Sequence, residues 1–215
     1  TPQGRVPDLT AAFDENGVAA DPALAVVRDD LVAAIEDTIT RAIGAGGITY
    51  AYPFVAHTGA GNHVVEPIAQ VVARTNSVSQ RRLPDEDARS LVWDDTLLFD
   101  TDKFSGWDRI ETGTRANVGA QYTFQSKGGG YARFIAGQSF HVGGDNPYED
   151  PGFIRDPKTN LLVANFSPRS GLDTNRSDYV IGAYLAPTST FKLVSQARFD
   201  ETELSLRRAN IYSNF

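Results

Sequence analysis

A strict alternation of apolar and polar side chains in the middle of the chain limits what the protein can fold into. Apolar residues recur at every second position from Ala116 to Phe124, and the alternate positions carry polar residues such as Arg115, Asn117 and Gln121. Successive side chains of a β-strand point to opposite faces of the sheet, so this segment predicts a strand with one apolar and one polar face. Two structures contain such strands: a sheet over a soluble core, and the wall of a transmembrane β-barrel.

The two-residue period begins near Ile48 and predicts seven strands. They span residues 48–56, 63–74, 112–125, 131–142, 178–186, 191–199 and 203–213. The connections between them alternate between short (57–62, 126–130 and 187–190) and long (75–111 and 143–177), apart from the short last one, 200–202. Outer-membrane barrels alternate short periplasmic turns with long external loops, whereas long structureless loops are uncommon in compact domains. The connections therefore favour a transmembrane barrel.

The apolar rows of three predicted strands carry no charged residue in mid-row. Read at every second residue, the rows run over 132–140, 179–185 and 191–199, and the polar residues within them are Gln138 and Ser195. A lipid-facing Arg or Lys costs about 2–4 kcal/mol at the middle of a bilayer. The uncharged rows therefore indicate strands that face lipid.

Residues 1–47 predict a separate region, a polar loop followed by one amphipathic helix. Asp21-Pro22 resembles a helix start, and apolar residues then recur at steps of three and four over 22–43 until a run of glycines ends the pattern. Residues 48–215 are predicted to form barrel strands and loops of a larger barrel. Since the chain lacks methionine and a signal peptide, we expect it to be a processed piece of a longer protein.

Composition excludes several classes of function. Twenty basic and 27 acidic residues give a net charge of -7, which argues against binding to nucleic acid. The absence of cysteine removes disulfides, thiolate zinc sites and cysteine nucleophiles. An apolar run of about 18 residues, as a transmembrane helix needs, does not occur, but a barrel needs none.

The residues that could carry chemistry have simpler interpretations. Acidic groups at 85–87, 94–95 and 100–102 share one long connection and are predicted to be a solvated acidic loop, with a divalent-cation site as the alternative hypothesis. His57, His63 and His141 lack metal-ligand spacing, and Ser139 lacks the surroundings of a hydrolase nucleophile. The sequence therefore predicts no catalytic residue, metal or cofactor, and the protein is not expected to be an enzyme.

A compact turn, Gly106-Trp107-Asp108-Arg109, precedes the central alternating strand. Its simplest interpretation is a turn carboxylate, Asp108, beside a cation, Arg109, at the entry to the strand. The alternative hypothesis is that Asp108 and Arg109 order an external loop against the barrel wall.

Longer blocks of sequence resemble a known family. Residues 83–124, which read LPDEDARSLVWDDTLLFDTDKFSGWDRIETGTRANVGAQYTF, resemble the signature region of the LPS-assembly outer-membrane protein LptD, also called OstA or organic solvent tolerance protein. VVEPIAQVVAR at 64–74 resembles that family's LEP-x-AQ strand. GQSFHVGG at 137–144 and the run over 170–211 continue the resemblance, which is closest to alphaproteobacterial members.

The resemblance implies a fold, a substrate and partners. Members form a large antiparallel barrel in the outer membrane of Gram-negative bacteria, and a periplasmic N-terminal domain receives lipopolysaccharide from the Lpt bridge. An LptE-type lipoprotein plugs the barrel, and lipid A leaves sideways into the outer leaflet. The resemblance thus implies that this chain is an internal barrel segment of about seven strands in the lipopolysaccharide translocon, surrounded by outer-membrane lipid.

In such a barrel the polar rows face the lumen. The predicted lumen-facing residues are Arg115, Asn117, Gln121 and Arg133, which would contact sugar or the plug lipoprotein. Two other functions stay open at this point, a passive porin-like channel and a soluble β-sandwich binding module.

Overall fold

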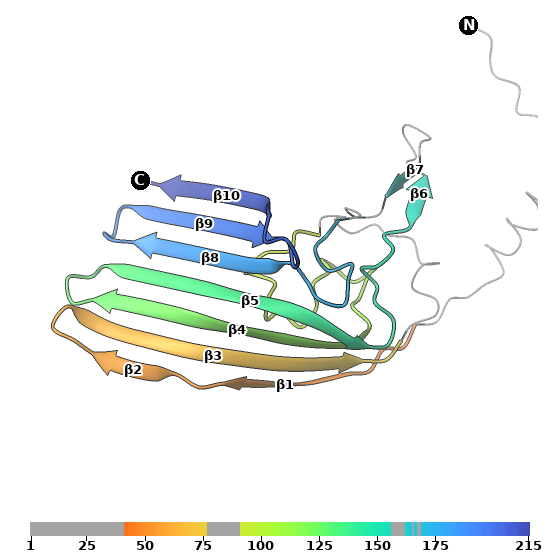
Figure 1. Ribbon diagram of the computed structural model, residues 1–215, viewed down its shortest axis with the longest axis horizontal. Coiled ribbons are helices and arrows are strands. Elements are labelled where there is room, and N and C mark those ends of the chain that lie inside the picture. Colours follow the sequence, from red (N-terminus) through yellow and green to blue (C-terminus); the bar gives the residue numbers. More distant parts are fainter. Residues whose placement is uncertain (1–40, 77–90, 156–161, 165, 167–168) are drawn as a thin grey trace, which may run out of the picture. The chain divides into compact units, whose positions relative to one another are not determined.

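The computed structural model describes residues 41–76, 91–155, 162–164, 166 and 169–215, and eight antiparallel strands of this part form one open sheet (Figure 1). The strand order is β1-β3-β4-β5-β8-β9-β10, with β2 beside β3. The strands of this sheet are β1 (Ala45–Ala51), β2 (Phe54–His57), β3 (Gly61–Arg74), β4 (Gly113–Ser126), β5 (Tyr131–Gly143), β8 (Tyr179–Ala186), β9 (Lys192–Phe199) and β10 (Leu206–Asn214). A separate hairpin pairs β6 (Phe153–Arg155) with β7 (Leu162–Ala164).

The first predicted strand, 48–56, is wrong as a single strand, because it is divided into β1 and β2 by Tyr52-Pro53. Both strands pair with β3 in one continuous register, from Ala51 opposite Ile68 to Phe54 opposite Val65. Pro53 has no N–H to donate, and Pro67 of β3 lies directly opposite Tyr52 and also has none. The ladder between these strands keeps the bond from Tyr52 N to Pro67 O, at 3.3 Å, and is interrupted beyond it. The other six predicted strands are confirmed to within a few residues.

The predicted helix at 22–43 lies outside the described residues, apart from Arg41-Ala42-Ile43, which are not helical. The alternation of short and long connections is visible in Figure 1, where the hairpins after β2, β4 and β8 share one end of the sheet. The long connections 75–112 and 144–178 leave from the opposite end. At the hairpin end, Gly129 adopts a φ of 91°, which a residue with a side chain rarely tolerates.

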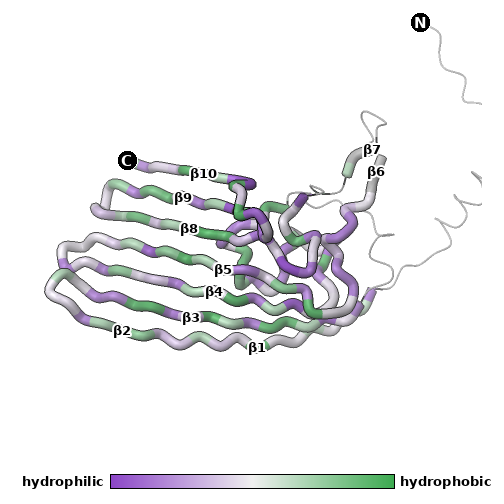
Figure 2. Tube along the Cα trace, in the orientation of Figure 1, coloured by the Kyte–Doolittle hydropathy of each residue, from purple (hydrophilic) through white to green (hydrophobic). Residues whose placement is uncertain are grey.

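One face of the sheet, here called the apolar face, presents uncovered apolar side chains. Because directly opposed residues share a face, Val118 lies beside Ala69, and Tyr122 lies between Val65 and Phe134. Figure 2 shows the resulting alternation of hydrophobic and hydrophilic residues along the strands. The large exposed apolar residues of this face are Ile48, Tyr50, Phe54, Val65, Val71, Val118, Phe134, Tyr179, Ile181 and Ile211.

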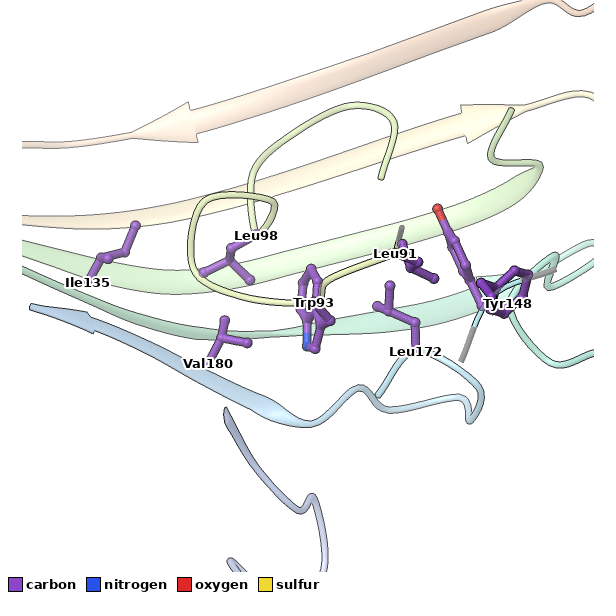
Figure 3. Close-up of a cluster of buried hydrophobic side chains, with 8 residues drawn as sticks. Leu91, Trp93, Leu98, Ile135, Tyr148, Leu172 and Val180 are labelled. Atoms are coloured by element: carbon purple, nitrogen blue, oxygen red, sulfur yellow. The ribbon is translucent and has the colours of Figure 1, made fainter. Parts of the chain in front are cut away.

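The opposite face, here called the polar face, is partly covered. Residues 91–112 of the first long connection, here called the covering segment, fold over it and contribute Leu91, Trp93 and Leu98 to a buried cluster (Figure 3). The sheet contributes Ile135 and Val180. Burial of each large side chain contributes about 1.5–3 kcal/mol, so the covering segment has a hydrophobic core of its own. The remaining buried members, Tyr148, Phe166 and Leu172, come from the second long connection.

Candidate functional site

The four predicted lumen-facing residues all lie on the polar face. Arg115, Asn117 and Gln121 occupy alternate positions of β4, and Arg133 of β5 is directly opposite Thr123 of the same row. Their surroundings differ. Arg115 and Asn117 are 2% and 0% exposed, whereas Gln121 and Arg133, nearer the hairpin end, are half-buried. The polar face therefore has a covered half towards the long connections and a more open half towards the hairpins.

A buried ion cluster lies in the covered half around Glu111. Arg115 Nε donates to Glu111 Oε1 at 2.5 Å, and Lys103 Nζ and Arg74 Nη1 lie 3.6 and 4.0 Å from Glu111 Oε2. All four side chains are less than 10% exposed, so each charge depends on the others for compensation. Burial lowers the pKa of Lys103, and the negative charge of Glu111 opposes that shift.

An amide chain links three strands to the covering segment. Asn117 Nδ2 donates to Gln70 Oε1 at 2.7 Å, and Ser139 Oγ donates to Asn117 Oδ1 at 2.5 Å. Gln70 Nε2 in turn donates to the Phe99 carbonyl at 3.0 Å. Buried amides require such partners, because a buried polar group without a hydrogen bond is costly. Asn117, predicted as a sugar-contacting residue, thus bonds to its neighbours in the sheet, and Gln70 joins this chain of hydrogen bonds to the covering segment.

The prediction of a solvated acidic loop is wrong for Asp95 and Asp102. Asp95 is buried and accepts hydrogen bonds from Tyr184 Oη at 2.5 Å and Gln196 Nε2 at 2.8 Å. Asp102 accepts from the backbone N–H of Phe104 at 3.1 Å, and burial raises the pKa of its carboxyl. The physical reason is that the apolar residues of the same segment draw these carboxylates under cover. Asp85, Glu86 and Asp87 lie outside the described residues.

The turn Gly106-Trp107-Asp108-Arg109 leads into β4 and has an exposed tip. Gly106 has a φ of 92°, and Trp107 is 80% exposed. Arg41 donates to the carbonyl of Asp108 at 2.8 Å and to that of Trp107. The turn is thus bound through its backbone, and a role of the Asp108 and Arg109 side chains stays a hypothesis.

The sequence also held residues of the site that pattern reading missed. The most important are Trp93, Asp95, Leu98, Lys103 and Glu111, all buried in the covering segment or at its end. A signal existed for Trp93, Asp95 and Leu98, because the stretch LVWDDTLLF over 91–99 is more apolar than a solvated loop would be. The stretch has no regular period, so it predicts neither a strand nor a helix.

The described histidines and carboxylates form no metal centre. Among the residues that the structure describes, no three His, Asp or Glu side chains gather closely enough to hold a metal ion. His63 Nδ1 is 2.8 Å from Tyr122 Oη, and His141 Nε2 is 3.1 Å from the Gly144 carbonyl. Within the same described part, no helix has the length and apolar character needed to cross a membrane.

These observations define a class of protein: all-β, with one antiparallel sheet that exposes its apolar face and folds a loop over its polar face. The family model of LptD, described as LPS transport system D, matches residues 20–215, and the chain belongs to that family. LPS transport and an outer-membrane location in Gram-negative bacteria are properties of the family. The resemblance read from the sequence is thereby confirmed. No individually curated protein matches the chain.

Proposed function

We propose that this chain forms part of the wall of an outer-membrane β-barrel that inserts lipopolysaccharide into the outer leaflet of a Gram-negative bacterium. Membership of the LptD family supports the substrate and the location. The observation that carries the proposal is the exposed apolar face. Apolar side chains such as Ile48 and Ile211, at the two edges of the sheet, are 76% and 72% exposed, and lipid would cover them.

The apolar face also satisfies the electrostatic demands of lipid. At the positions that the strand register pairs across this face, from β1 to β10 in the described sheet, no Lys, Arg, Asp or Glu occurs. Two of its polar side chains have partners within the protein. Gln138 Nε2 donates to the Ser177 carbonyl at 2.7 Å, and His63 contacts Tyr122 Oη. Satisfied polar groups are tolerated where unsatisfied ones are not.

The positions of the covered and uncovered faces argue against a soluble β-sandwich. A sandwich buries its apolar face against a second layer and leaves the polar face in water. Here the covering layer is on the polar face, and no described segment covers Val118, Phe134 or Ile181. A passive porin-like channel would have the same two faces, and only the family match favours a translocon over it.

The partners of the proposed translocon follow from the family and from the two halves of the polar face. Lipopolysaccharide sugar or an LptE-type plug lipoprotein would contact the more open half, where Arg133 Nε donates to Gln121 Oε1 at 2.9 Å. Outer-membrane lipid would contact the apolar face. The periplasmic Lpt bridge would deliver lipopolysaccharide through a periplasmic domain of the complete protein.

Cysteine labelling tests the proposed orientation, because these 215 residues contain no cysteine. In the full-length protein in outer-membrane vesicles, Phe134→Cys and Arg133→Cys place neighbouring thiols on opposite faces. We expect a water-soluble maleimide to label Arg133→Cys and spare Phe134→Cys, and a lipid-soluble maleimide to label Phe134→Cys.

Gln125→Cys is the second polar-face position, and labelling after denaturation calibrates the reagent. The proposal is wrong if the water-soluble reagent labels Phe134→Cys as fast as Arg133→Cys and Gln125→Cys. Asn117 is unsuitable as a lumen reporter, because it is fully buried under the covering segment.

A further inference from the structure

Three glycines of the polar face accommodate the covering segment, and they are here called the glycine socket. Gly119 and Gly137 are directly opposed on β4 and β5, and Gly182 of β8 lies opposite Ile135 of β5. Their backbones are in ordinary strand conformation, since none of the three has a positive φ. The need for glycine at these positions is therefore a need for space.

Two side chains of one turn fill that space. A Cβ at Gly137 would lie 2.6 Å from Leu98 Cδ2, and one at Gly119 would lie 3.2 Å from the same atom. The Asp95 carboxylate occupies the place that a Cβ at Gly182 would take. Figure 3 shows Leu98 above the strands, near Ile135 and Val180.

The turn is also bound by polar contacts. Leu98 N donates to Asp95 O at 3.4 Å within the turn, and the Asp95 carboxylate accepts from Tyr184 of β8 and Gln196 of β9. Hydrogen bonds to a buried charged group are strong, and the charge is costly to bury without them. Asp95 thus ties one end of the turn to β8 and β9, and Gln70 of β3 bonds to the Phe99 carbonyl at the other end.

The docked turn lies where the buried part of the polar face meets the half-exposed part. With the turn in place, Leu98 and Ser139 are both 0% exposed, and the row of Gln70, Asn117 and Ser139 has its hydrogen bonds inside the protein. Beyond the turn, Gln121 and Arg133 remain half-buried. The boundary between the covered half and the more open half therefore coincides with the glycine socket.

We propose that residues 94–99 and the glycine socket form an intramolecular latch that keeps the covered half of the polar face closed to hydrophilic molecules. Where this wall lines a lumen, which rests on the proposed function, sugar passing along it contacts Gln121 and Arg133 and reaches the row of Gln70 and Asn117 only after the latch opens. The latch itself does not depend on that function.

Gly182→Ala is the sharpest test of the latch, because the three nearest atoms to the added methyl group all belong to Asp95. Gly119 and Gly137 are poorer choices, since a methyl group there also meets the backbone of the opposite strand, at Ala136 O and Val118 O. The reporter is Ser139→Cys, a small change at a fully buried position, in the full-length protein in outer-membrane vesicles.

We expect a water-soluble maleimide to label Ser139→Cys at least about tenfold faster in the Gly182→Ala background, since loss of one strong hydrogen bond changes a local opening equilibrium by that order. Gly46→Ala is the matched control: Gly46 is also a strand glycine, and no atom lies within 4 Å of its added Cβ. It should leave the labelling rate unchanged.

Leu98→Ser gives an independent opening of the latch without altering any strand, and it should accelerate labelling in the same direction. The latch is refuted if Gly182→Ala and Leu98→Ser both leave Ser139→Cys as slow as in the parent. A failure of the proposed function would appear elsewhere, in the Phe134→Cys and Arg133→Cys pair, which does not require the latch.

Discussion

The two faces of the sheet are covered in the reverse order from that of a soluble protein. On the polar face, Trp93 and Leu98 are fully buried above amides and charges of the strands. On the apolar face, Ile48 is 76% exposed, and no described segment covers it. Water normally drives the apolar face inward, so the contrast teaches that the two faces are adapted to different surroundings.

The contrast extends to how each face is stabilised. The polar face combines the buried cluster around Trp93 with ion pairs to Glu111 and hydrogen bonds to Asn117 and Asp95. The described part of the apolar face has side-chain rows, ring contacts such as Tyr122 with Phe134 at a centroid distance of 6.1 Å, and isolated hydrogen bonds such as that of Gln138, but no ion pair. Substitutions on the two faces should therefore act through different mechanisms.

The largest expected effect distinguishes the two tryptophans. Trp93→Ala removes a fully buried side chain from the covering segment, and we expect it to destabilise that segment by about 3–5 kcal/mol. Trp107→Ala, at the exposed tip of the turn, should change the free energy by about 0.5 kcal/mol or less. Hydrogen exchange of residues 91–112 in the full-length protein measures both. Equal effects would contradict the assignment of the core to the polar face.

The next largest effect is expected from a charged side chain introduced on the apolar face. Ile181→Arg places a cation in an exposed apolar row and should cost about 2–4 kcal/mol if the row faces the middle of a bilayer. Gln125→Arg, on the polar face near the hairpins, is the control and should cost about 0.5 kcal/mol or less. Urea unfolding of the full-length protein in lipid vesicles gives the free energies. A near-zero cost for Ile181→Arg would mean that water, not lipid, covers this face.

A substitution in the more open half of the polar face should cost less free energy of unfolding than one in the covered half. Arg133→Ala loses the hydrogen bond to Gln121 and the stacking over Tyr184, whose ring centroid is 5.4 Å away, and should cost about 1 kcal/mol because the guanidinium is only half-buried. The same unfolding measurement applies, with Lys127→Ala in the exposed hairpin as the control. If Arg133→Ala costs more free energy than Trp93→Ala, the more open half contributes more to stability than the covered half, contrary to this prediction.

The smallest effect concerns pH. Burial raises the pKa of Asp102 above its ordinary value of 3.8, so the folded segment favours the protonated carboxyl more than the unfolded chain does. Its contribution is therefore fully present below pH 3.8 and is lost as the pH rises through the raised pKa. Asp102→Asn should remove this dependence while an amide oxygen still accepts from Phe104 N. Fluorescence of Trp93 against pH, in a Trp107→Phe background, reports it.

Asp100→Asn is the control for that measurement, because Asp100 lies in the same segment but is exposed. Its fluorescence profile should follow the parent. If Asp102→Asn also follows the parent, the half-buried carboxyl at 102 makes no difference to the stability of the segment.

The strands were predictable because their period is local. The alternation around Asn117 places each residue on a face without knowledge of its neighbours, and the structure agrees at Arg115, Gln121 and Arg133. The break at Tyr52-Pro53 was harder to predict, because it depends on Pro67 of the next strand as well as on Pro53. The register that places Pro67 opposite Tyr52 depends on both segments, so neither segment alone predicts the break.

By itself, the sequence determined that this chain forms antiparallel strands with one uncharged apolar row and one polar row, and it carried the family resemblance. Only the tertiary structure decided that the polar row around Asn117 is covered by the chain's own residues 91–112, with Leu98 and Asp95 in the glycine socket. The reason is physical: alternation is set by the geometry of one strand, whereas the docking of a loop without a period depends on contacts between residues far apart in the chain.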